Sequence, residues 1–495
     1  MTLAGMFERA GVSPRSLRGD AEIARAFIDS RACVPGSLFV CMPGGTQDPH
    51  TFIPSALANG TVACVVFDAG ALEAHPQVPM ALLDASEYED ALWRLMDALY
   101  DHPSRAMTLV GITGTNGKTT TAWLVRQLFT LLGKRAGYLG TLGFSLDGQP
   151  DRELNNTTPF CVETYDLVAQ ARDAGIEALA MEVSSHALAQ KRVDGLEFDV
   201  AVFTNLTQDH LDFHGSMEAY RDAKFRLFQE LPGLSTKKAS FVLNADELVI
   251  ARELSIMGDE PMLWFSRTDL CEPLTIENLH VGVAEIGGEI TDPVGGRSAF
   301  VAPLGGDYNV ENLIAAVGAV IATGGQLAEI APLLARLRPV PGRFEPVANG
   351  RGIGILVDYA HTPDALEKVL DTAKSLTPGR LIAVFGCGGD RDRTKRPKMA
   401  RAASERADLT VVTSDNPRTE DPQSILDEVL TGIVPGRESV DIIDRREAVS
   451  YAIRVAKPGD TVVIAGKGHE DYQIIGRTKH PMDDRELARE ALAAL

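Results

Sequence analysis

The chain has 495 residues, 45% of them apolar and 23% charged, and a formal net charge of −20 at pH 7. This length predicts two to four domains with large buried cores, and the acidic charge argues against nucleic acid as a partner. No apolar run is long enough to cross a membrane, no signal-peptide pattern is present, and the six cysteines show no metal-ligand spacing. We therefore expect a cytoplasmic enzyme with reduced thiols.

The first predicted domain spans residues 1–104. It contains strand-like runs at 37–41 and 62–67, separated by a turn-rich segment. Residues 101–105, Asp-His-Pro-Ser-Arg, interrupt the periodicity and are predicted to form a linker.

The second predicted domain spans residues 105–337 and begins with a glycine-rich loop. Residues 111–120 read GITGTNGKTT and follow an apolar run, and apolar residues then recur with helical spacing up to a glycine at the C-cap position. In such a loop the backbone amides surround phosphate oxygens, Lys118 reaches the β- and γ-phosphates, and Thr119 offers its hydroxyl to Mg²⁺. The order of strand, loop and helix predicts a site for ATP or GTP; the alternative is a turn that binds nothing.

Two further strands of this domain, predicted at 178–183 and 200–204, are followed by polar residues. Glu182 ends the first strand and either holds Mg²⁺ or caps the next helix. The residues after the second strand offer possible metal ligands, although the histidine equally suits a structural role: Asp209, His210 and Asp212. Lys224 lies on a predicted helix, where its spacing favours a solvated side chain.

The third predicted domain spans residues 338–495. Short β-branched runs alternate with helical patterns and predict a doubly wound, mostly parallel sheet: 354–357, 381–385, 409–413 and 461–465. Asp, His, Arg and Glu follow these strands, at the edge where ligands bind in such sheets. Turn formation explains the glycines and prolines there but not the charged residues, so we predict a second ligand site.

The motifs together resemble those of the Mur ligases, ATP-dependent amide-bond-forming enzymes of peptidoglycan precursor synthesis. The resemblance extends over the whole chain, in order, and its motifs are residues 114–120 (GTNGKTT), 181–186 (MEVSSH), 204–214, 358–364 (DYAHTPD) and 415–418 (DNPR). It implies an α/β protein with three domains: an N-terminal UDP-binding domain, a central P-loop ATPase domain with a mostly parallel sheet, and a C-terminal Rossmann-like domain.

The resemblance implies addition of meso-2,6-diaminopimelate to the D-Glu carboxylate of UDP-MurNAc-L-Ala-D-Glu through an acyl phosphate. ATP is the co-substrate, and the implied cofactors are two Mg²⁺ ions and a CO₂-derived carbamate on Lys224. The implied partners are these small molecules only, with no nucleic acid and no membrane, and the implied state is a monomer. Four alternatives are disfavoured. The arginine of residues 415–418 argues against a lysine-adding ligase, and a folylpolyglutamate synthetase would share only the phosphate loop. A nucleotide switch would carry an Asn-Lys-x-Asp guanine-reading motif, which the sequence lacks, and the intact Lys118, Thr119 and Glu182 argue against a binding module without catalysis.

The resemblance also assigns residues to each ligand. The implied catalytic and metal residues are Lys118, Thr119, Glu182, His210 and Lys224 as N6-carboxylysine. The implied ATP contacts are Gly114, Thr115, Asn116, Gly117, Lys118, Thr119, Thr120, Asn309, Arg343 and Asp358. The implied UDP-MurNAc-dipeptide contacts are Ile28, Ser30, Gly45, Thr46, Gln47, Asn156, Thr157, Thr158, Ser184, Gln190 and Arg192. The implied diaminopimelate contacts are Arg391, Asp415, Asn416, Pro417, Arg418, Gly466 and Glu470.

Two of these arginines have a second interpretation. The planar guanidinium of Arg418 matches a carboxylate bidentately, which favours diaminopimelate over lysine; the alternative is that residues 415–418 cap a helix. Arg343 is either a nucleotide contact or a surface charge of the linker.

Overall fold

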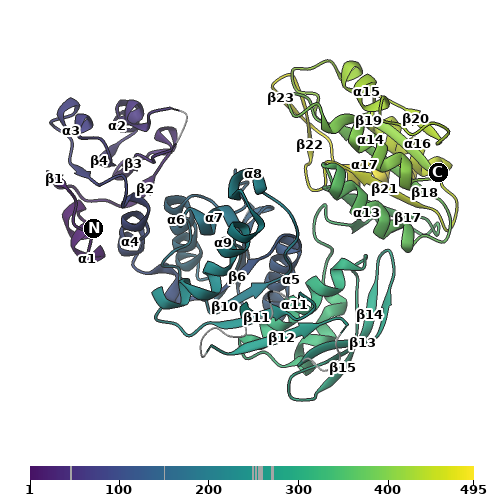
Figure 1. The fold of residues 1–495 in the computed structure, drawn as a ribbon, viewed down its shortest axis with the longest axis horizontal. Helices are drawn as coiled ribbons and strands as arrows, with labels where there is room; N and C mark the ends of the chain where they lie inside the picture. The colour runs from purple at the N-terminus through teal and green to yellow at the C-terminus, as the bar shows by residue number, and fades with distance from the viewer. Residues whose placement is uncertain (45–46, 150, 248–249, 251–252, 255–259, 269–272) are drawn as a thin grey trace. The chain divides into compact units, whose positions relative to one another are not determined.

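The computed structural model describes residues 1–495 except 45–46, 150, 248–249, 251–252, 255–259 and 269–272. The chain forms two compact units, and Figure 1 labels their helices and strands. The first contains Met1–Thr275 and Asn312–Leu327, and the second contains Ile276–Glu311 and Ala328–Leu495. No helix in the described part of the chain is long and apolar enough to span a membrane.

The first unit begins with a five-stranded sheet in the order β1-β5-β4-β3-β2, parallel except for β1. Its strands are β1 (Ser16–Arg18), β2 (Arg25–Phe27), β3 (Ser37–Val40), β4 (Thr61–Val66) and β5 (Met80–Leu82). Its helices are α1 (Leu3–Ala10), α2 (Ile53–Ala58), α3 (Ala69–Ala74) and α4 (Tyr88–Leu99). The two predicted strands are confirmed as β3 and β4. The predicted linker contains a 3₁₀ turn, η3 (Pro103–Ala106), in which Pro103 and Ser104 are buried.

A larger sheet follows, with β6 between two parallel neighbours, β9 and β10. Its strands in this unit are β6 (Thr108–Thr113), β7 (Ala136–Gly140), β8 (Gly143–Leu146), β9 (Ala178–Glu182), β10 (Val200–Phe203), β11 (Ser240–Asn244), β12 (Met262–Ser266) and the start of β13 (Leu274–Val281). Its helices are α5 (Lys118–Leu131), α6 (Cys161–Asp173), α7 (Ser185–Ala189), α8 (Leu211–His214), α9 (Met217–Gln229) and most of α11 (Tyr308–Ala322). The predicted strand, glycine loop and helix are confirmed as β6, its loop and α5.

The second unit contains an antiparallel pair that the sequence analysis missed, β14 (Ile286–Thr291) and β15 (Arg297–Ala302). The expected alternation of strands and helices up to residue 337 is wrong here. A turn signal was present, because residues 292–296 read Asp-Pro-Val-Gly-Gly and the Asp292 carboxylate accepts from the amides of Val294 (3.0 Å) and Gly296 (2.7 Å). The short α12 (Leu327–Ile330) follows α11 in the chain.

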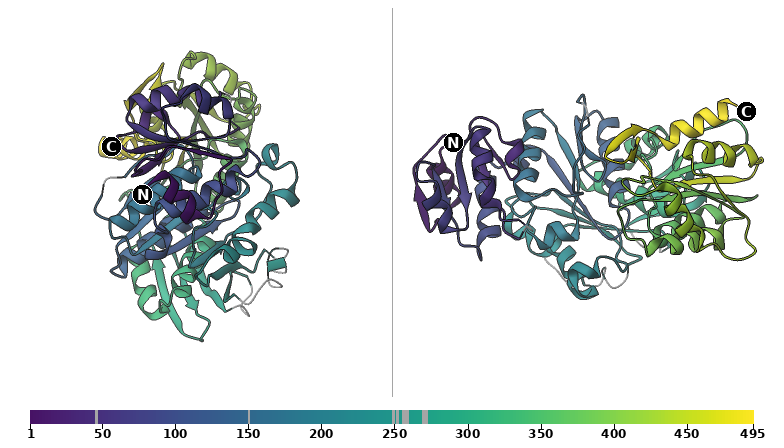
Figure 2. Two further views of the ribbon diagram at one scale, coloured as in Figure 1. Left: turned by 90° about the vertical axis from the view of Figure 1, so that its left-hand side faces the viewer. Right: turned by 90° about the horizontal axis from the view of Figure 1, so that it is seen from above.

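The rest of the second unit is a six-stranded sheet in the order β16-β17-β21-β18-β19-β20, parallel except for β16. Figures 1 and 2 draw this part of the chain in green to yellow, with helices beside its strands. Its strands are β16 (Glu345–Pro346), β17 (Gly354–Asp358), β18 (Leu381–Cys387), β19 (Leu409–Ser414), β20 (Ser439–Asp441) and β21 (Thr461–Ala465), and β22 (Tyr472–Ile475) pairs with β23 (Thr478–Pro481). Its helices are α13 (Pro363–Ser375), α14 (Lys395–Arg406), α15 (Pro422–Leu430), α16 (Arg445–Val455) and α17 (Asp484–Ala493).

Alternate residues of these parallel strands enter two separate cores. Leu356 and Ala383 pack in the core that includes α13, α14 and α15, whereas Ile355 and Ile382 pack in the core that includes α16 and α17. A parallel sheet covered on both faces reads as continuous apolar runs, which is the pattern that the sequence analysis used. The doubly wound sheet is confirmed.

The ends of β19 and β21 are fixed by a buried ion pair. Arg445 contacts Asp484 bidentately (Nε–Oδ1 2.7 Å, Nη2–Oδ2 2.6 Å), and both side chains are 0% exposed. The same guanidinium donates to the carbonyls of Ser414 (3.3 Å) and Ala465 (3.0 Å), the last residues of the two strands. One buried cation therefore anchors the start of both following loops.

We expect Arg445→Met to lower the free energy of unfolding by about 3–5 kcal/mol, because it leaves the Asp484 carboxylate buried without its partner. Urea titration will measure the loss. The matched control is Arg446→Met, which removes a neighbouring exposed cation paired with Glu490 and should cost less than about 1 kcal/mol. Equal losses in the two variants would contradict a special role for the buried pair.

Candidate active site

The loop between β6 and α5 depends on glycine at two positions. Gly114 has φ +144° and Gly117 has φ +84°, both in the region that favours glycine. A Cβ at Gly114 would overlap the Thr204 hydroxyl, and one at Gly117 would overlap the Asn312 amide oxygen. The loop therefore needs both glycines, as the sequence predicted.

The segment after β10 supports this loop from the side. Thr115 N donates to Asn205 O (2.8 Å), Asn116 N donates to Asn205 Oδ1 (2.9 Å), and Thr204 Oγ1 donates to Asn116 O (2.6 Å). Two motifs that lie almost 90 residues apart in the sequence thus form one structure. The predicted ATP contacts from residue 114 to residue 120 all lie in this structure.

Two lysines converge on one carbonyl in this loop. Lys118 Nζ donates to Gly114 O at 3.0 Å, and Lys224 Nζ donates to the same oxygen at 2.7 Å. The Lys224 side chain is 0% exposed and its Nζ lies 4.5 Å from the centre of the Tyr220 ring. Burial and the Lys118 charge lower the pKa of Lys224 well below its usual value. The solvated lysine favoured by helical spacing is wrong, because α9 also buries the residues on both sides, Ala223 and Phe225.

Glu182 is buried beside the loop with an exposure of 1%. Its Oε1 accepts from Tyr138 OH (2.5 Å) and Thr141 N (2.8 Å), and its Oε2 accepts from Thr119 Oγ1 (2.9 Å). The alternative role as a helix cap is wrong, because Ser184 caps α7. A carboxylate next to the loop threonine hydroxyl supplies the oxygen ligands that Mg²⁺ prefers, so these residues fit the ion.

His210 stands at the start of α8 with a side chain that is 47% exposed. Its Nε2 lies 3.5 Å from Asp209 Oδ2, and its ring centre lies 4.8 Å from that of His186. Among the described residues no three His, Cys, Asp or Glu side chains form a metal-binding group. A metal role for His210 stays a prediction.

Five predicted UDP-MurNAc-dipeptide residues lie together next to Glu182. Thr158 Oγ1 donates to Glu182 O (2.8 Å) and accepts from Ser184 N (3.0 Å), while Arg192 donates to Thr158 O (2.7 Å) and to Gln190 Oε1 (2.6 and 2.9 Å). Thr157 Oγ1 lies 3.1 Å from Thr141 Oγ1, which also contacts Glu182 (3.3 Å). The hydrogen bonds extend from the candidate metal ligand to this group.

The remaining residues of that prediction lie outside this hydrogen-bonded group. Asn156 is half-buried, Ile28 and Ser30 follow β2, and Ser30 O accepts from Asn59 Nδ2 (2.9 Å). Gln47 is exposed, whereas Gly45 and Thr46 lie outside the described residues.

In the second unit the predicted nucleotide residues gather around Phe344. Asp358, at the end of β17, accepts from Phe344 N (2.7 Å), and burial raises its pKa. The Arg343 guanidinium lies 5.0 Å from the centre of the Tyr359 ring, and its buried Nε has no hydrogen-bond partner among the described residues. Arg343 is thus half-buried against Tyr359, and its role as a nucleotide contact stays a prediction. Asn309 donates to Gly305 O (2.6 Å) next to Tyr308, whose ring packs on Phe344.

The loops after β18, β19 and β21 converge, as predicted. Asn416 Nδ2 donates to Glu470 Oε2 (2.9 Å), and Arg418 Nη1 donates to Gly389 O (2.8 Å). A Cβ on Gly466 would lie 2.7 Å from Asp415 Oδ2. Residues 415–418 cap no helix, because α15 begins after its N-cap Asp421. Pro417 lies in the same loop, and the exposed Arg391 makes one long bond, to Asp390 O (3.4 Å).

Lys467 is a residue of this group that the sequence analysis missed. Its side chain is 0% exposed, and its Nζ lies 3.3 Å from Asn416 Oδ1 and 3.4 Å from Glu470 Oε2. It links the loop after β19 to the loop after β21. Its position between two glycines directly after a strand was the available signal.

The sequence matches two family models over most of its length. The model of the Mur ligase middle domain matches residues 112–320, and the model described as the Mur ligase, glutamate ligase domain matches residues 342–468. The chain belongs to the Mur ligase family. It is therefore a ligase of a family of ATP-dependent amide-bond-forming enzymes, and its fold is that of Mur ligases.

Similar Mur ligases match the full chain. A UDP-N-acetylmuramoyl-L-alanyl-D-glutamate–2,6-diaminopimelate ligase from Gloeobacter violaceus is 47% identical over 100% of this chain and 98% of its own. The Nostoc sp. enzyme of the same name is 45% identical over 96% and 95% of the two chains. A solved structure with this name is 33% identical, has a TM-score of 0.70, and covers 100% of this chain and 99% of its own.

Glu182 provides a test of the candidate nucleotide site of this Mur ligase. We expect Glu182→Gln to lower kcat about 100-fold and to raise the Mg²⁺ concentration needed for half-maximal rate, because the amide keeps the shape but loses the charge. Phosphate release across a Mg²⁺ series will measure both. Glu177→Gln, an exposed residue just before β9, is the matched control. Wild-type kcat and Mg²⁺ dependence in Glu182→Gln would contradict the metal role.

Proposed function

We propose that this chain adds meso-2,6-diaminopimelate to the D-Glu carboxylate of UDP-MurNAc-L-Ala-D-Glu, with ATP, in peptidoglycan precursor biosynthesis. The observation that best supports this proposal is the convergence of Arg418, Asn416 and Glu470 at one edge of the sheet. A guanidinium and a carboxylate together suit the carboxylate and ammonium on the far carbon of diaminopimelate. The names of the full-length relatives support the same amino acid.

The chemistry requires activation of a carboxylate, which is a poor electrophile. The γ-phosphoryl group moves from ATP to the D-Glu carboxylate, and the amine then attacks the acyl phosphate to give the amide, ADP and phosphate. Because phosphoryl transfer needs positioning and charge neutralisation, the loop amides and Lys118 have the central role. Thr119, Glu182, His210 and carbamylated Lys224 would hold two Mg²⁺ ions, which neutralise phosphate charge.

The other proposed roles concern the binding of the two substrates and of adenosine. Thr157, Thr158, Ser184, Gln190 and Arg192, with Asn156, bind the muramoyl-dipeptide, and the residues after β2 bind the uridine side. Asn309, Arg343 and Asp358 bind adenosine. We assign residues 1–104 to UDP binding, 105–337 to ATP and 338–495 to the amino acid. We further propose that the enzyme acts in the cytoplasm, where ATP and water-soluble substrates are available, and that it acts as a monomer.

Product analysis tests the substrate assignment. Protein supplied with ATP, Mg²⁺, UDP-MurNAc-L-Ala-D-Glu and equal diaminopimelate and lysine should form the diaminopimelate adduct, as measured by mass spectrometry. A lysine adduct as the main product would support the lysine-adding alternative. A glutamyl adduct of folate, formed in a parallel mixture, would support the folylpolyglutamate synthetase.

A further inference from the structure

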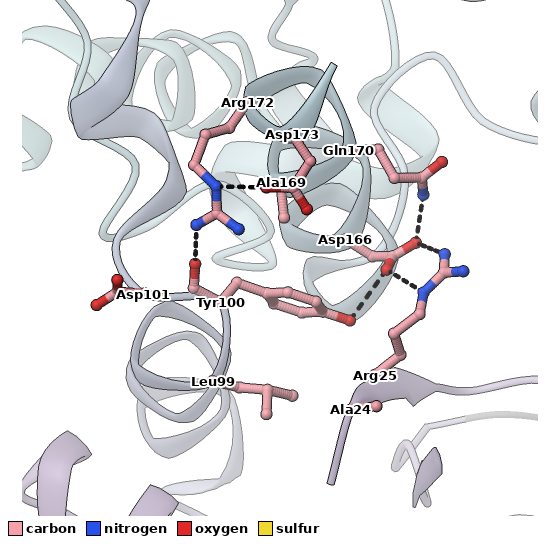
Figure 3. A pocket seen from close by; sticks show the side chains of 10 residues that line it. All are labelled: Ala24, Arg25, Leu99, Tyr100, Asp101, Asp166, Ala169, Gln170, Arg172 and Asp173. Carbon is pink, nitrogen blue, oxygen red and sulfur yellow. Dashed lines mark hydrogen bonds and ion pairs between the residues drawn. The ribbon is translucent and has the colours of Figure 1, made fainter. Parts of the chain in front are cut away.

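Three side chains from different segments meet at the Asp166 carboxylate (Figure 3). Arg25, at the start of β2, donates from Nε to Asp166 Oδ1 (2.8 Å) and from Nη2 to Oδ2 (2.5 Å). Tyr100, just after α4, donates to Oδ1 (3.1 Å), and Gln170 of α6 donates to Oδ2 (2.6 Å). We call Arg25, Tyr100, Asp166 and Gln170 the Asp166 clamp.

The Asp166 clamp is built into the fold. The Asp166 side chain is only 9% exposed, and its hydrogen bonds raise the pKa of Arg25. Tyr100 OH also accepts from Ala26 N (3.0 Å), and Arg172 of α6 donates to the Tyr100 carbonyl. A bidentate arginine on a carboxylate with two further donors fixes direction as well as distance. The clamp borders a cavity of about 300 Å³ that gives it partial access to solvent.

The clamp lies between the chain segments that carry the two proposed ends of the sugar-nucleotide site. Ile28 and Ser30 follow shortly after Ala26, whose amide the clamp holds. Thr157 and Thr158 lie just before α6, which carries Asp166. The clamp itself contains no predicted substrate contact. It joins the segment on the uridine side to the segment on the dipeptide side.

We propose that the Asp166 clamp positions these two half-sites so that one UDP-linked substrate binds both at once; this rests on the proposed function. When one end of a linked ligand is bound, the second end binds at an effective concentration that depends on the separation and rigidity of the two sites. A fixed separation also removes an ordering cost from binding. Loosening the clamp therefore lowers the affinity for the linked substrate and leaves the affinity for each separate half unchanged.

Arg25→Met tests this positioning role with the whole substrate and its halves. The KM for UDP-MurNAc-L-Ala-D-Glu should rise at least tenfold, with kcat and the KM values for ATP and diaminopimelate changed less than twofold. The inhibition constant of UDP alone and the KM for MurNAc-L-Ala-D-Glu without UDP should also change less than twofold. The matched control is Arg94→Met, an exposed arginine of α4, for which all constants should be those of the wild type.

Two results would overturn the proposal. One is an equal loss of affinity for one half and for the whole substrate, which indicates an effect within one half-site or on folding. The other is an unchanged KM for the whole substrate. If Arg25→Met does not fold, Tyr100→Phe is the second variant, because it keeps the ring and removes one donor. The KM for the whole substrate should then rise at least threefold relative to the constants of the two halves, and no rise would overturn the proposal. An inactive wild-type protein would contradict the proposed function instead, so the two failures are distinguishable.

Discussion

Lys224→Ala is expected to lower kcat by about 100- to 1,000-fold, because it removes the amine on which the proposed carbamate forms. The wild-type protein should lose activity when CO₂ and bicarbonate are removed and regain it when bicarbonate is added. Phosphate release in the two buffers measures both effects. The matched control is Lys238→Ala, an exposed lysine, which should keep wild-type kcat and the same response to bicarbonate.

The surroundings of Lys224 explain why this amine is suited to the modification. It is fully buried, contacts the Gly114 carbonyl, and has no carboxylate within ion-pair distance among the described residues. Burial without a counter-ion disfavours the ammonium form. The uncharged amine forms an N–C bond to CO₂ and releases one proton, which gives a carbamate anion. Counted from the ammonium form, the amine loses two protons in all, and a cation is replaced by an anion. Full activity of Lys224→Ala in bicarbonate-free buffer would contradict the carbamate.

Arg418→Ala is expected to lower kcat/KM for diaminopimelate at least tenfold and to reduce the discrimination against lysine. A charge-assisted hydrogen bond contributes about 1.5–3 kcal/mol, and a tenfold change corresponds to about 1.4 kcal/mol. Lysine lacks the far carboxylate, so its own kcat/KM should not fall in the variant. Parallel assays with the two amino acids measure the ratio.

The fold should tolerate this change. The backbone of Arg418 is held by main-chain bonds, in which Arg418 N donates to Ile474 O (3.0 Å) and Gly476 N donates to Arg418 O (2.7 Å). Arg418 already has a φ of +50°, and an alanine meets the same restriction there, so the substitution adds no new backbone strain. Arg477→Ala is the control, because Arg477 is an exposed cation in the β22–β23 hairpin that the Arg418 backbone contacts. Near-normal diaminopimelate kinetics in Arg418→Ala would refute the role.

The parts of the structure that the sequence predicted are those set by local rules. The loop at Gly114 and Gly117 needs positive φ, and β21 is a short β-branched run between turns, so both were visible without tertiary information. The position of Glu182 at the end of a strand beside the loop also followed from parallel topology.

The features that the sequence did not predict depend on tertiary packing. Helical spacing could not show that α9 buries Lys224, since that depends on the loop carbonyl 110 residues earlier. Lys467 reads as an ordinary loop lysine until Asn416 and Glu470 are placed around it. The family resemblance assigned a role to Lys224, which helical spacing alone could not do. It assigned no role to Lys467.

Phosphate release by the wild-type protein tests the central claim most directly. With ATP and Mg²⁺ present, UDP-MurNAc-L-Ala-D-Glu and diaminopimelate are added separately and then together. Sustained release that requires both, with one ADP formed for each tripeptide product, is the predicted result. No nucleotide consumption with both substrates present, or release that is independent of the diamine, would contradict the assignment.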